Sequence, residues 1–357
     1  MFCPQSKIFG FSPISRAVLL LTISLGGLIV SGCDRQITVQ STSRVQPVRP
    51  SPPVIPAPEL TTLVPTQPTP GSDIQRPAPT KTKPAVPFSK PTSQASSYQA
   101  TQAEALALPP KPDQDSPRVP IRVAIAQQSP YLVIGSSTPA TVVDQQGQAV
   151  KQLVPSAAEN FMAQGGQLRI GAQSAPNVVW IKPESATGLV YVSGRWYRGA
   201  VQVVANNGKL TGVNHLDMES YLYSVVGSEM PASWPLEALK SQAIAARSYA
   251  LAHIARPANP LFDLGDTQRW QAYKGIETET GSTLAAVEET AGIVLSHNGA
   301  VVESLYAASD QIVREVHKGF GMSQNGANQL AQRQYNYQQI LAHFYPGTRL
   351  AWLQFSS

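Results

Sequence analysis

The sequence has few of the residues that form metal sites, disulfides and nucleophilic triads. Its 357 residues include two cysteines and five scattered histidines, and charged residues make up only 14%. It contains no HExxH motif, no paired CxxC and no glycine-rich phosphate loop between a strand and a helix. The GxSxG turn of acyl hydrolases is also missing. These absences argue against the common zinc, nucleotide and serine-hydrolase chemistries and leave the carboxylates as candidates.

A basic surface for nucleic acid is missing as well. The pI of about 9.1 suggests an excess of positive charge. However, residues 34–120 hold nine Lys or Arg against six Asp or Glu, and residues 121–357 hold sixteen of each. The part of the chain that is long enough to fold is therefore formally neutral. Since no Lys/Arg stripe with interleaved aromatics is present, we expect no nucleic-acid partner.

Both cysteines lie close to the N-terminus. Lys7 and Arg16 flank a short positive region, and the apolar run AVLLLTISLGGLIV that follows has the length of a signal peptide rather than of a spanning helix. The run ends in VSGC, a pattern that resembles a bacterial lipoprotein signal. We therefore expect residues 1–32 to be a signal peptide and Cys33 to carry a lipid. The protein would be held at a membrane of the cell envelope, on its periplasmic or outer side. An ordinary cleaved signal with an incidental cysteine is the alternative.

Proline is concentrated in one segment. Of the 31 prolines, 19 lie between Pro47 and Pro120, mixed with Ser, Thr and Gln and without a sustained apolar period. Such a segment cannot bury enough apolar surface to offset its chain entropy, and its prolines favour extended conformations. We predict that residues 33–120 are a disordered tether. A small domain of short strands is the alternative, against which the exclusion of proline from strand interiors counts.

Residues 121–357 have the pattern of one α+β domain. Its first half consists of short β-branched runs separated by turns, and Asn206–Gly208 predicts a tight hairpin. The second half is helical: apolar residues of DMESYLYSVVG lie on one helical face, with Gly227 placed to end the helix. A second, alanine-rich helix is expected from Pro235 to Pro257. Further expected elements are a helix ending at Glu289, a strand at 293–296 and two short C-terminal helices.

Glu229 is the leading carboxylate candidate. It lies in EMPASWP, which we expect to be a loop between the two helices, stiffened by Pro231 and Pro235. Met230 and Trp234 are apolar neighbours that would raise the pKa of the carboxyl and keep it able to donate a proton. General acid catalysis at a glycosidic oxygen needs that property. The alternative is a solvated carboxylate that interacts with the dipole of the next helix.

Several long motifs resemble those of a known family. The stretch VNHLDMESYLYSVVGSEMPASWPLEALKSQAIAARSYAL resembles the signature of the SpoIID/LytB family, that is, stage II sporulation protein D and the amidase enhancer. WYRGAVQVV and GMSQNGANQLAQRQYNYQQILAHFYPGTRL resemble its flanking parts, so the resemblance covers about residues 121–352. It implies a role on peptidoglycan. Sporulation members are lytic transglycosylases that cut between N-acetylmuramic acid and N-acetylglucosamine, and the catalytic acid/base of their EMP motif matches Glu229.

A His-Asn-Gly turn after the strand at 293–296 predicts a second strand that ends near Tyr306, and the chain departs from the family pattern after that strand. Family members usually carry an SGGHT-type segment there, whereas YAASDQIVREVHKGFGMSQ passes directly to the next motif, with Lys318 where the family has histidine. That region supplies metal ligands in some members, so we expect no bound metal and no cofactor here. The remaining Gly-rich loop is expected either to offer Ser323 and Gln324 to sugar hydroxyls or to be a plain turn.

The helix after the EMP segment carries three further candidates for substrate binding. Lys240 and Arg247 are two turns apart on roughly one face, where they would meet the lactyl carboxylate of muramic acid, and Gln242 lies between them. Solvated surface positions are the alternative. Two functions follow from these observations: a lytic transglycosylase acting on glycan strands, or a non-catalytic peptidoglycan-binding protein or activator of a cell-wall amidase. The shortened region favours the second.

Overall fold

The structure is a computed structural model that describes residues 37–40, 105–113, 116–257 and 259–355. The expected signal peptide, Cys33 and residues 41–104 of the expected tether lie outside these residues. Several residues that we had expected in the tether contact the domain. Ile37–Gln40 pair antiparallel with residues 352–355, Leu106 N donates to Gln338 O at 3.3 Å, and Trp352 Nε1 donates to Pro109 O at 2.8 Å.

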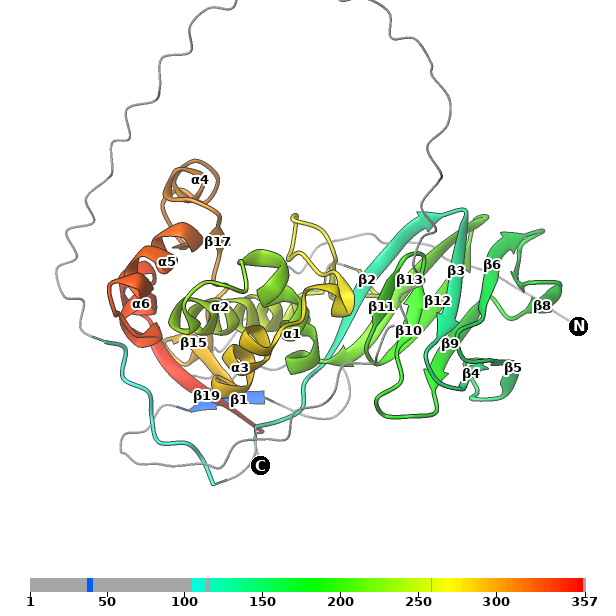
Figure 1. Ribbon diagram of the computed structural model, residues 1–357, viewed down its shortest axis with the longest axis horizontal. Helices are drawn as coiled ribbons and strands as arrows, with labels where there is room; N and C mark the ends of the chain where they lie inside the picture. The colour runs from blue at the N-terminus through cyan, green and yellow to red at the C-terminus, as the bar shows by residue number, and fades with distance from the viewer. Residues whose placement is uncertain (1–36, 41–104, 114–115, 258, 356–357) are drawn as a thin grey trace, which may run out of the picture. The chain divides into compact units, whose positions relative to one another are not determined.

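The first half of the described domain is formed by two antiparallel sheets that share an apolar core (Figure 1). The seven-stranded sheet has, in order, β14 (Leu264–Gly265), β2 (Pro120–Ser129), β13 (Lys209–Asp217), β12 (Ala200–Asn206), β9 (Val178–Pro183), β4 (Ala140–Val143) and β5 (Ala149–Leu153); only its edge strand β14 runs parallel to its neighbour. The six-stranded sheet has β11 (Arg195–Tyr197), β10 (Val190–Val192), β3 (Tyr131–Ser136), β6 (Ala158–Gln164), β7 (Gln167–Ile170) and β8 (Gln173–Ala175).

The second half is helical and carries two small sheets. Its helices are α1 (Met218–Glu229), α2 (Leu236–Ala255), the 3₁₀ turn η1 (Gly275–Thr278), α3 (Gly281–Glu289), α4 (Asp310–Val316), α5 (Gln324–Gln332) and α6 (Tyr337–Phe344). One sheet has, in order, the strands β1 (Ile37–Gln40), β19 (Arg349–Phe355), β15 (Ile293–His297) and β16 (Ala300–Val301). The other is the parallel pair β17 (Tyr306–Ala307) and β18 (Met322–Ser323). The α+β class, with the β-rich half first, is thereby confirmed.

The hairpin between β12 and β13 leads into the helical half. Asn206 pairs with Lys209, and Asn207 and Gly208 between them have φ of +50° and +72°. Two consecutive positive φ values give a tight turn whose twist suits the flanking strands, as the sequence predicted. Since β13 continues directly into α1, this hairpin fixes the point from which α1 starts.

α1 begins with a side-chain cap and packs through an apolar face. Asp217 Oδ1 accepts a hydrogen bond from Ser220 N at 3.0 Å, which satisfies one of the free N–H groups of the first turn. The apolar face expected from the sequence is buried: Met218, Tyr221, Leu222, Val225 and Val226. α1 is therefore anchored both at its start and along its side.

The expected end of α1 at Gly227 is wrong, because the helix continues to Glu229. A Cβ on Gly227 would overlap the carbonyl oxygen of Thr278 in η1. The glycine therefore allows two backbones to approach closely and does not end the helix. As a result Glu229 is the last residue of a packed helix, whereas we had expected it in a loop.

α2 is the central helix of the second half and contacts α1, α3, α5, α6 and β15 (Figure 1). Pro235 is its N-cap, so the helix begins one residue later than expected. Ala243, Ala245 and Ala246 are fully buried, in keeping with close packing of neighbours around it. None of the helices in the described residues combines the length and apolar character needed to cross a membrane.

The remaining expected elements of the helical half are present, and several others were not expected. α3 ends at Glu289, β15 covers the expected strand at 293–296, and α5 and α6 are the two short C-terminal helices. The short helix α4, the 3₁₀ turn η1 and the strands β14, β18 and β19 were missed. β19 pairs antiparallel with β15 and so joins the C-terminal residues to the centre of the helical half.

Candidate active site

The carboxyl of Glu229 is held by donors from two distant segments. Its Oε1 accepts a hydrogen bond from Ala272 N at 2.7 Å, and its Oε2 accepts one from Gln324 Nε2 at 3.2 Å. Ala272 lies between β14 and η1, and Gln324 is the first residue of α5. The site is therefore assembled from the end of α1, one loop and the start of α5.

The expected stiff loop contributes less than we had predicted. Pro231 is exposed and Trp234 half-buried, and the described contact between them is a turn in which Trp234 N donates to Pro231 O at 3.0 Å. The contacts that orient the Glu229 carboxyl come instead from residues 272 and 324. Met230, by contrast, is buried, with 1% of its surface exposed, next to Glu229 in the chain.

The surroundings of Glu229 favour its protonated form. Burial raises the pKa of the Glu229 carboxyl above its ordinary value of 4.5, while the Ala272 N–H, the Gln324 amide and the charge of Lys274 act against this rise. A carboxyl with a raised pKa keeps its proton at a higher pH than an exposed glutamate does. It is thus suited to act as a general acid.

Three tyrosines lie close enough to this carboxyl to be affected by its charge, and one glutamine links two of them. The charge of Glu229 contributes to the raised pKa of Tyr221, Tyr249 and Tyr306, after burial as the largest cause in each. Tyr221 OH donates to Gln271 Oε1 at 3.0 Å, and Gln271 Nε2 donates to Tyr306 OH at 2.8 Å. Sequence reasoning missed these residues, because RWQAYKG around Gln271 carries no motif and only the tertiary fold brings it to Glu229.

Arg247 does not lie at a groove, which corrects its expected role in binding substrate. Its side chain is fully buried, and its guanidinium donates to both carboxylate oxygens of Glu219, at 3.0 and 2.6 Å. It also donates to Ile293 O at 3.0 Å and to Val287 O at 3.3 Å. The guanidinium is therefore used within the core.

Lys240 is also engaged within the protein. Its Nζ lies 2.8 Å from Glu237 Oε1 and 2.7 Å from Glu289 Oε2, and its side chain is 13% exposed. Lys240 and Arg247 do share a face of α2, as the spacing predicted, but that face packs toward α3 and the start of α1. The expected contact with a lactyl carboxylate therefore lacks a free cation at either position.

The other three predicted binding residues differ in their surroundings. Gln242 is fully buried, and neither of its amide atoms has a hydrogen-bond partner among the described residues. Ser323 is buried as well and caps α5, because its Oγ accepts from Gly326 N at 3.1 Å. Of the five residues that we had predicted to bind substrate, only Gln324 forms a hydrogen bond with Glu229. Ser323 thus acts on the site by fixing the start of the helix that carries Gln324.

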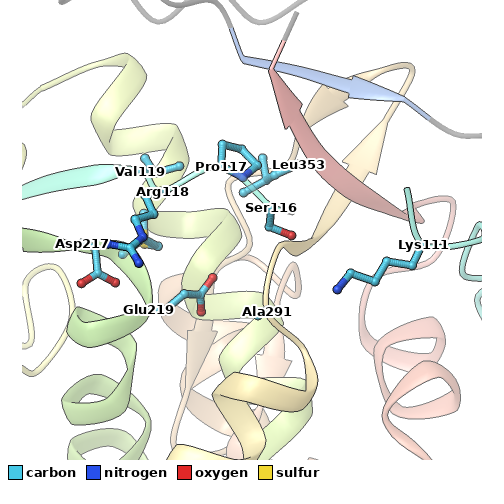
Figure 2. Close-up of a pocket in the computed structure, with 10 residues that line it drawn as sticks. Lys111, Ser116, Pro117, Arg118, Val119, Asp217, Glu219, Ala291 and Leu353 are labelled. Atoms are coloured by element: carbon cyan, nitrogen blue, oxygen red, sulfur yellow. The ribbon is translucent and has the colours of Figure 1, made fainter. Parts of the chain in front are cut away.

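The pocket of Figure 2 is separate from this site. It has a volume of about 280 Å³ and lies at the first turn of α1, where Asp217, Glu219, Lys111 and Arg118 line it. Ten residues of helix separate Glu219 from Glu229, which corresponds to about 15 Å.

In the part of the chain that the structure describes, no three His, Cys, Asp or Glu side chains form a group that could hold a metal ion. The expected metal-free site stays a prediction.

Comparison with known proteins identifies the helical half. Residues 206–297, from the β12–β13 hairpin through β15, match the SpoIID family described as stage II sporulation protein. This part of the chain is therefore similar to the SpoIID family. The matched range includes Glu229, the Ala272 segment and α2, whereas Gln324 lies beyond it.

Three curated relatives resemble part of this chain. It is 37% identical over 118 residues to an uncharacterized protein of Brachyspira hyodysenteriae, covering 33% of this chain and 32% of the relative. It is 33% identical over 166 residues to the amidase enhancer of Bacillus subtilis, covering 43% and 23%. It is 33% identical over 111 residues to stage II sporulation protein D of Bacillus subtilis, covering 26% and 32%. The chain thus spans a third or less of the length of these relatives.

Proposed function

We propose that this domain is a lytic transglycosylase that cleaves peptidoglycan glycan strands between N-acetylmuramic acid and N-acetylglucosamine, with Glu229 as general acid and then base. One observation carries the proposal: a largely buried carboxyl with a raised pKa lies at the end of a packed helix, held by two hydrogen-bond donors. The similarity to stage II sporulation protein D and to the amidase enhancer supports a role in the cell wall.

The reaction needs one carboxyl in two steps. Protonated Glu229 gives its proton to the glycosidic oxygen as the bond from that oxygen to C1 of muramic acid breaks. The resulting carboxylate then takes the proton of the muramic 6-hydroxyl, whose oxygen bonds to C1 and closes a 1,6-anhydro ring. Glu229 ends protonated, as it began, and no water is consumed.

The two hydrogen-bond donors at Glu229 act between the two proton transfers, when Glu229 is a carboxylate. When the carboxyl has given up its proton, Ala272 N–H and the Gln324 amide remain in place to hydrogen-bond the carboxylate. Groups that are already oriented stabilise a developing charge without having to reorganise. Among the described residues, no aspartate or glutamate forms a hydrogen bond with Glu229, which fits a mechanism with one carboxyl rather than a pair.

The test is cleavage by the purified protein. Intact peptidoglycan and glycan strands stripped of stem peptides are incubated with wild type and with Glu229→Gln, and the products are analysed by mass spectrometry. We expect anhydro-muramic products from the wild type and none from Glu229→Gln. If the wild type releases no such product from either substrate, or if both proteins release equal amounts, the mechanism is wrong.

A second candidate function is activation of a cell-wall amidase. The similarity to the amidase enhancer covers 43% of this chain, more than either of the other two similarities. In addition, Ile312, Val316 and Phe320 in and after α4 are 39%, 65% and 77% exposed, an apolar surface of the kind that binds other proteins. For this function an amidase should work faster when the protein is added, and Glu229→Gln should retain the effect.

We also propose that the chain is exported and anchored through lipid on Cys33, for which the sequence VSGC provides the support. A Cys33→Ser variant should then appear in the soluble fraction of the cell envelope, while the wild type sediments with membranes. Equal membrane association of both proteins would contradict the anchor.

A further inference from the structure

The hydroxyl of Tyr306 is connected to Glu229 through two consecutive residues. Gln271 Nε2 donates to Tyr306 OH at 2.8 Å, and the next backbone N–H, that of Ala272, donates to Glu229 Oε1 at 2.7 Å. Tyr306 lies in β17, which pairs in parallel with β18 in the register Tyr306↔Met322. Because Gln324 follows β18 directly, one short ladder places both Tyr306 and Gln324 beside the carboxyl.

The direction of the hydrogen bonds around Gln271 is fixed by its neighbours. Gln271 Nε2 lies 3.2 Å from Ala246 O, a carbonyl that can only accept, so the nitrogen of the amide must face it. The amide oxygen then faces Tyr221, whose hydroxyl donates to it at 3.0 Å. The second hydrogen of Nε2 points to Tyr306 OH. Tyr221 therefore uses its proton within this network, whereas Tyr306 accepts and keeps its own proton available.

No residue that the structure describes accepts this proton from Tyr306. The pKa of Tyr306 is raised well above its ordinary value, first by burial and then by the charge of Glu229, so the phenol stays protonated at all physiological pH values. Tyr306 is only partly buried. A hydrogen-bond donor without an acceptor, beside a catalytic carboxyl, is suited to a ligand that brings the acceptor.

We infer that Tyr306 donates a hydrogen bond to the acetamido carbonyl of an N-acetylhexosamine bound next to Glu229. A carbonyl oxygen can only accept, as the site requires, whereas a sugar hydroxyl can also present its own proton. A sugar whose acetyl group has been removed carries an ammonium group, which has donors only. The site therefore selects N-acetylated over de-N-acetylated glycan. Only the choice of a peptidoglycan sugar as the ligand rests on the proposed function.

Tyr221 provides a matched comparison, because its phenol bonds to the same Gln271 but uses its proton within the protein. Binding of a peptidoglycan tetrasaccharide without stem peptides is measured by calorimetry to the full chain carrying Glu229→Gln, which removes turnover. Tyr306→Phe on this background should weaken binding roughly five- to tenfold, the effect of one neutral hydrogen bond. Tyr221→Phe should weaken binding by clearly less than Tyr306→Phe does, although it removes the donor to a buried amide oxygen. A de-N-acetylated tetrasaccharide should bind weakly, and equally, to both variants.

A purely structural role for the two tyrosines makes the opposite prediction. Tyr221 is fully buried, so Tyr221→Phe should then lower the thermal midpoint and the affinity at least as much as Tyr306→Phe. The inference is overturned if Tyr221→Phe weakens binding as much as Tyr306→Phe or more. It is also overturned if the parent Glu229→Gln protein does not bind the tetrasaccharide. If instead the wild type proves unable to cleave but the binding contrast holds, the inference stands and the proposed reaction falls.

Discussion

Arg247 and Glu219 form a two-point ion pair between α2 and α1, with Nε–Oε1 and Nη2–Oε2 distances of 3.0 and 2.6 Å. Glu219 also accepts from Gly292 N at 3.3 Å, and Arg247 donates to the carbonyl groups of Val287 and Ile293. Four segments, α1, α2, the end of α3 and β15, therefore meet at one guanidinium. Since α1 carries Glu229 at its other end, this pair stabilises the helix that presents the candidate acid.

Replacing Arg247 should destabilise the domain strongly. Arg247→Ala leaves Glu219 without its partner and removes two further hydrogen bonds, and loss of one partner of a buried pair costs about 3–5 kcal/mol. Urea unfolding measures the change. Arg256→Ala is the control, because Arg256 forms a similar pair with Glu303 but is 72% exposed; it should change stability by less than about 1 kcal/mol. Equal effects of the two substitutions would contradict the structural role of Arg247.

The stability contribution of Glu229 should depend on pH in a defined direction. Its folded-state pKa is raised above the ordinary value of 4.5, so the folded state binds the proton more tightly than the unfolded state. Relative to Glu229→Gln, the wild type is therefore most stable below about pH 4.5 and loses stability as pH rises through the folded-state pKa. Urea unfolding of both proteins across a pH series measures this. A difference that grows in favour of the wild type as pH rises would be the wrong sign; Glu315→Gln, at an exposed position, controls for the change in net charge.

Removing the Gln324 amide should shift the pH profile of activity. The hydrogen bond from Gln324 lowers the pKa of Glu229, so Gln324→Ala raises that pKa further. We expect the alkaline limb of the cleavage rate to move to higher pH while the maximal rate falls, because the carboxylate loses one of its two donors. Gln332→Ala changes an exposed glutamine on the same helix and should leave the profile in place. A fall in rate without a shift would show that Gln324 does not act through the carboxyl.

Adding a methyl group at Gly227 should damage both stability and activity. The new Cβ would overlap Thr278 O, and such overpacking costs about 1–3 kcal/mol. Because the clash lies two residues before Glu229, the last turn of α1 would also move the carboxyl away from Ala272. Gly281→Ala is the matched control, since a Cβ at the start of α3 meets no atom within 4 Å. Thermal unfolding and cleavage are measured for both, and a harmless Gly227→Ala would show that α1 and η1 are not held together.

Local sequence patterns predicted elements better than they predicted contacts. The Asn207–Gly208 turn requires positive φ at two positions, which few residues other than asparagine and glycine tolerate, so its hairpin could be predicted. Gly227 was misread for a related reason. A glycine can mark a helix end or a close approach, and only the position of Thr278, 51 residues later, decides between the two.

The candidate site shows the same limit. Glu229 could be singled out from its motif, but its partners could not, because Ala272 acts through its backbone and therefore leaves no signal in the sequence. The spacing of Lys240 and Arg247 correctly placed them on one face of α2. It could not show that acidic side chains of α1 and α3, and not a groove, lie opposite that face.

The order of residues in the chain has a consequence for when the acid becomes competent. Gln324 follows Glu229 by 95 residues, and it comes into position only when β17, β18 and α5 have formed. The ribosome delivers the EMP segment long before these elements. Until they fold, the Glu229 carboxyl lacks the Gln324 donor that the folded structure supplies. A protein with the proposed activity would thus be unable to assemble its complete site while nascent or unfolded, and would gain the ability to cut glycan only after its C-terminal elements have folded.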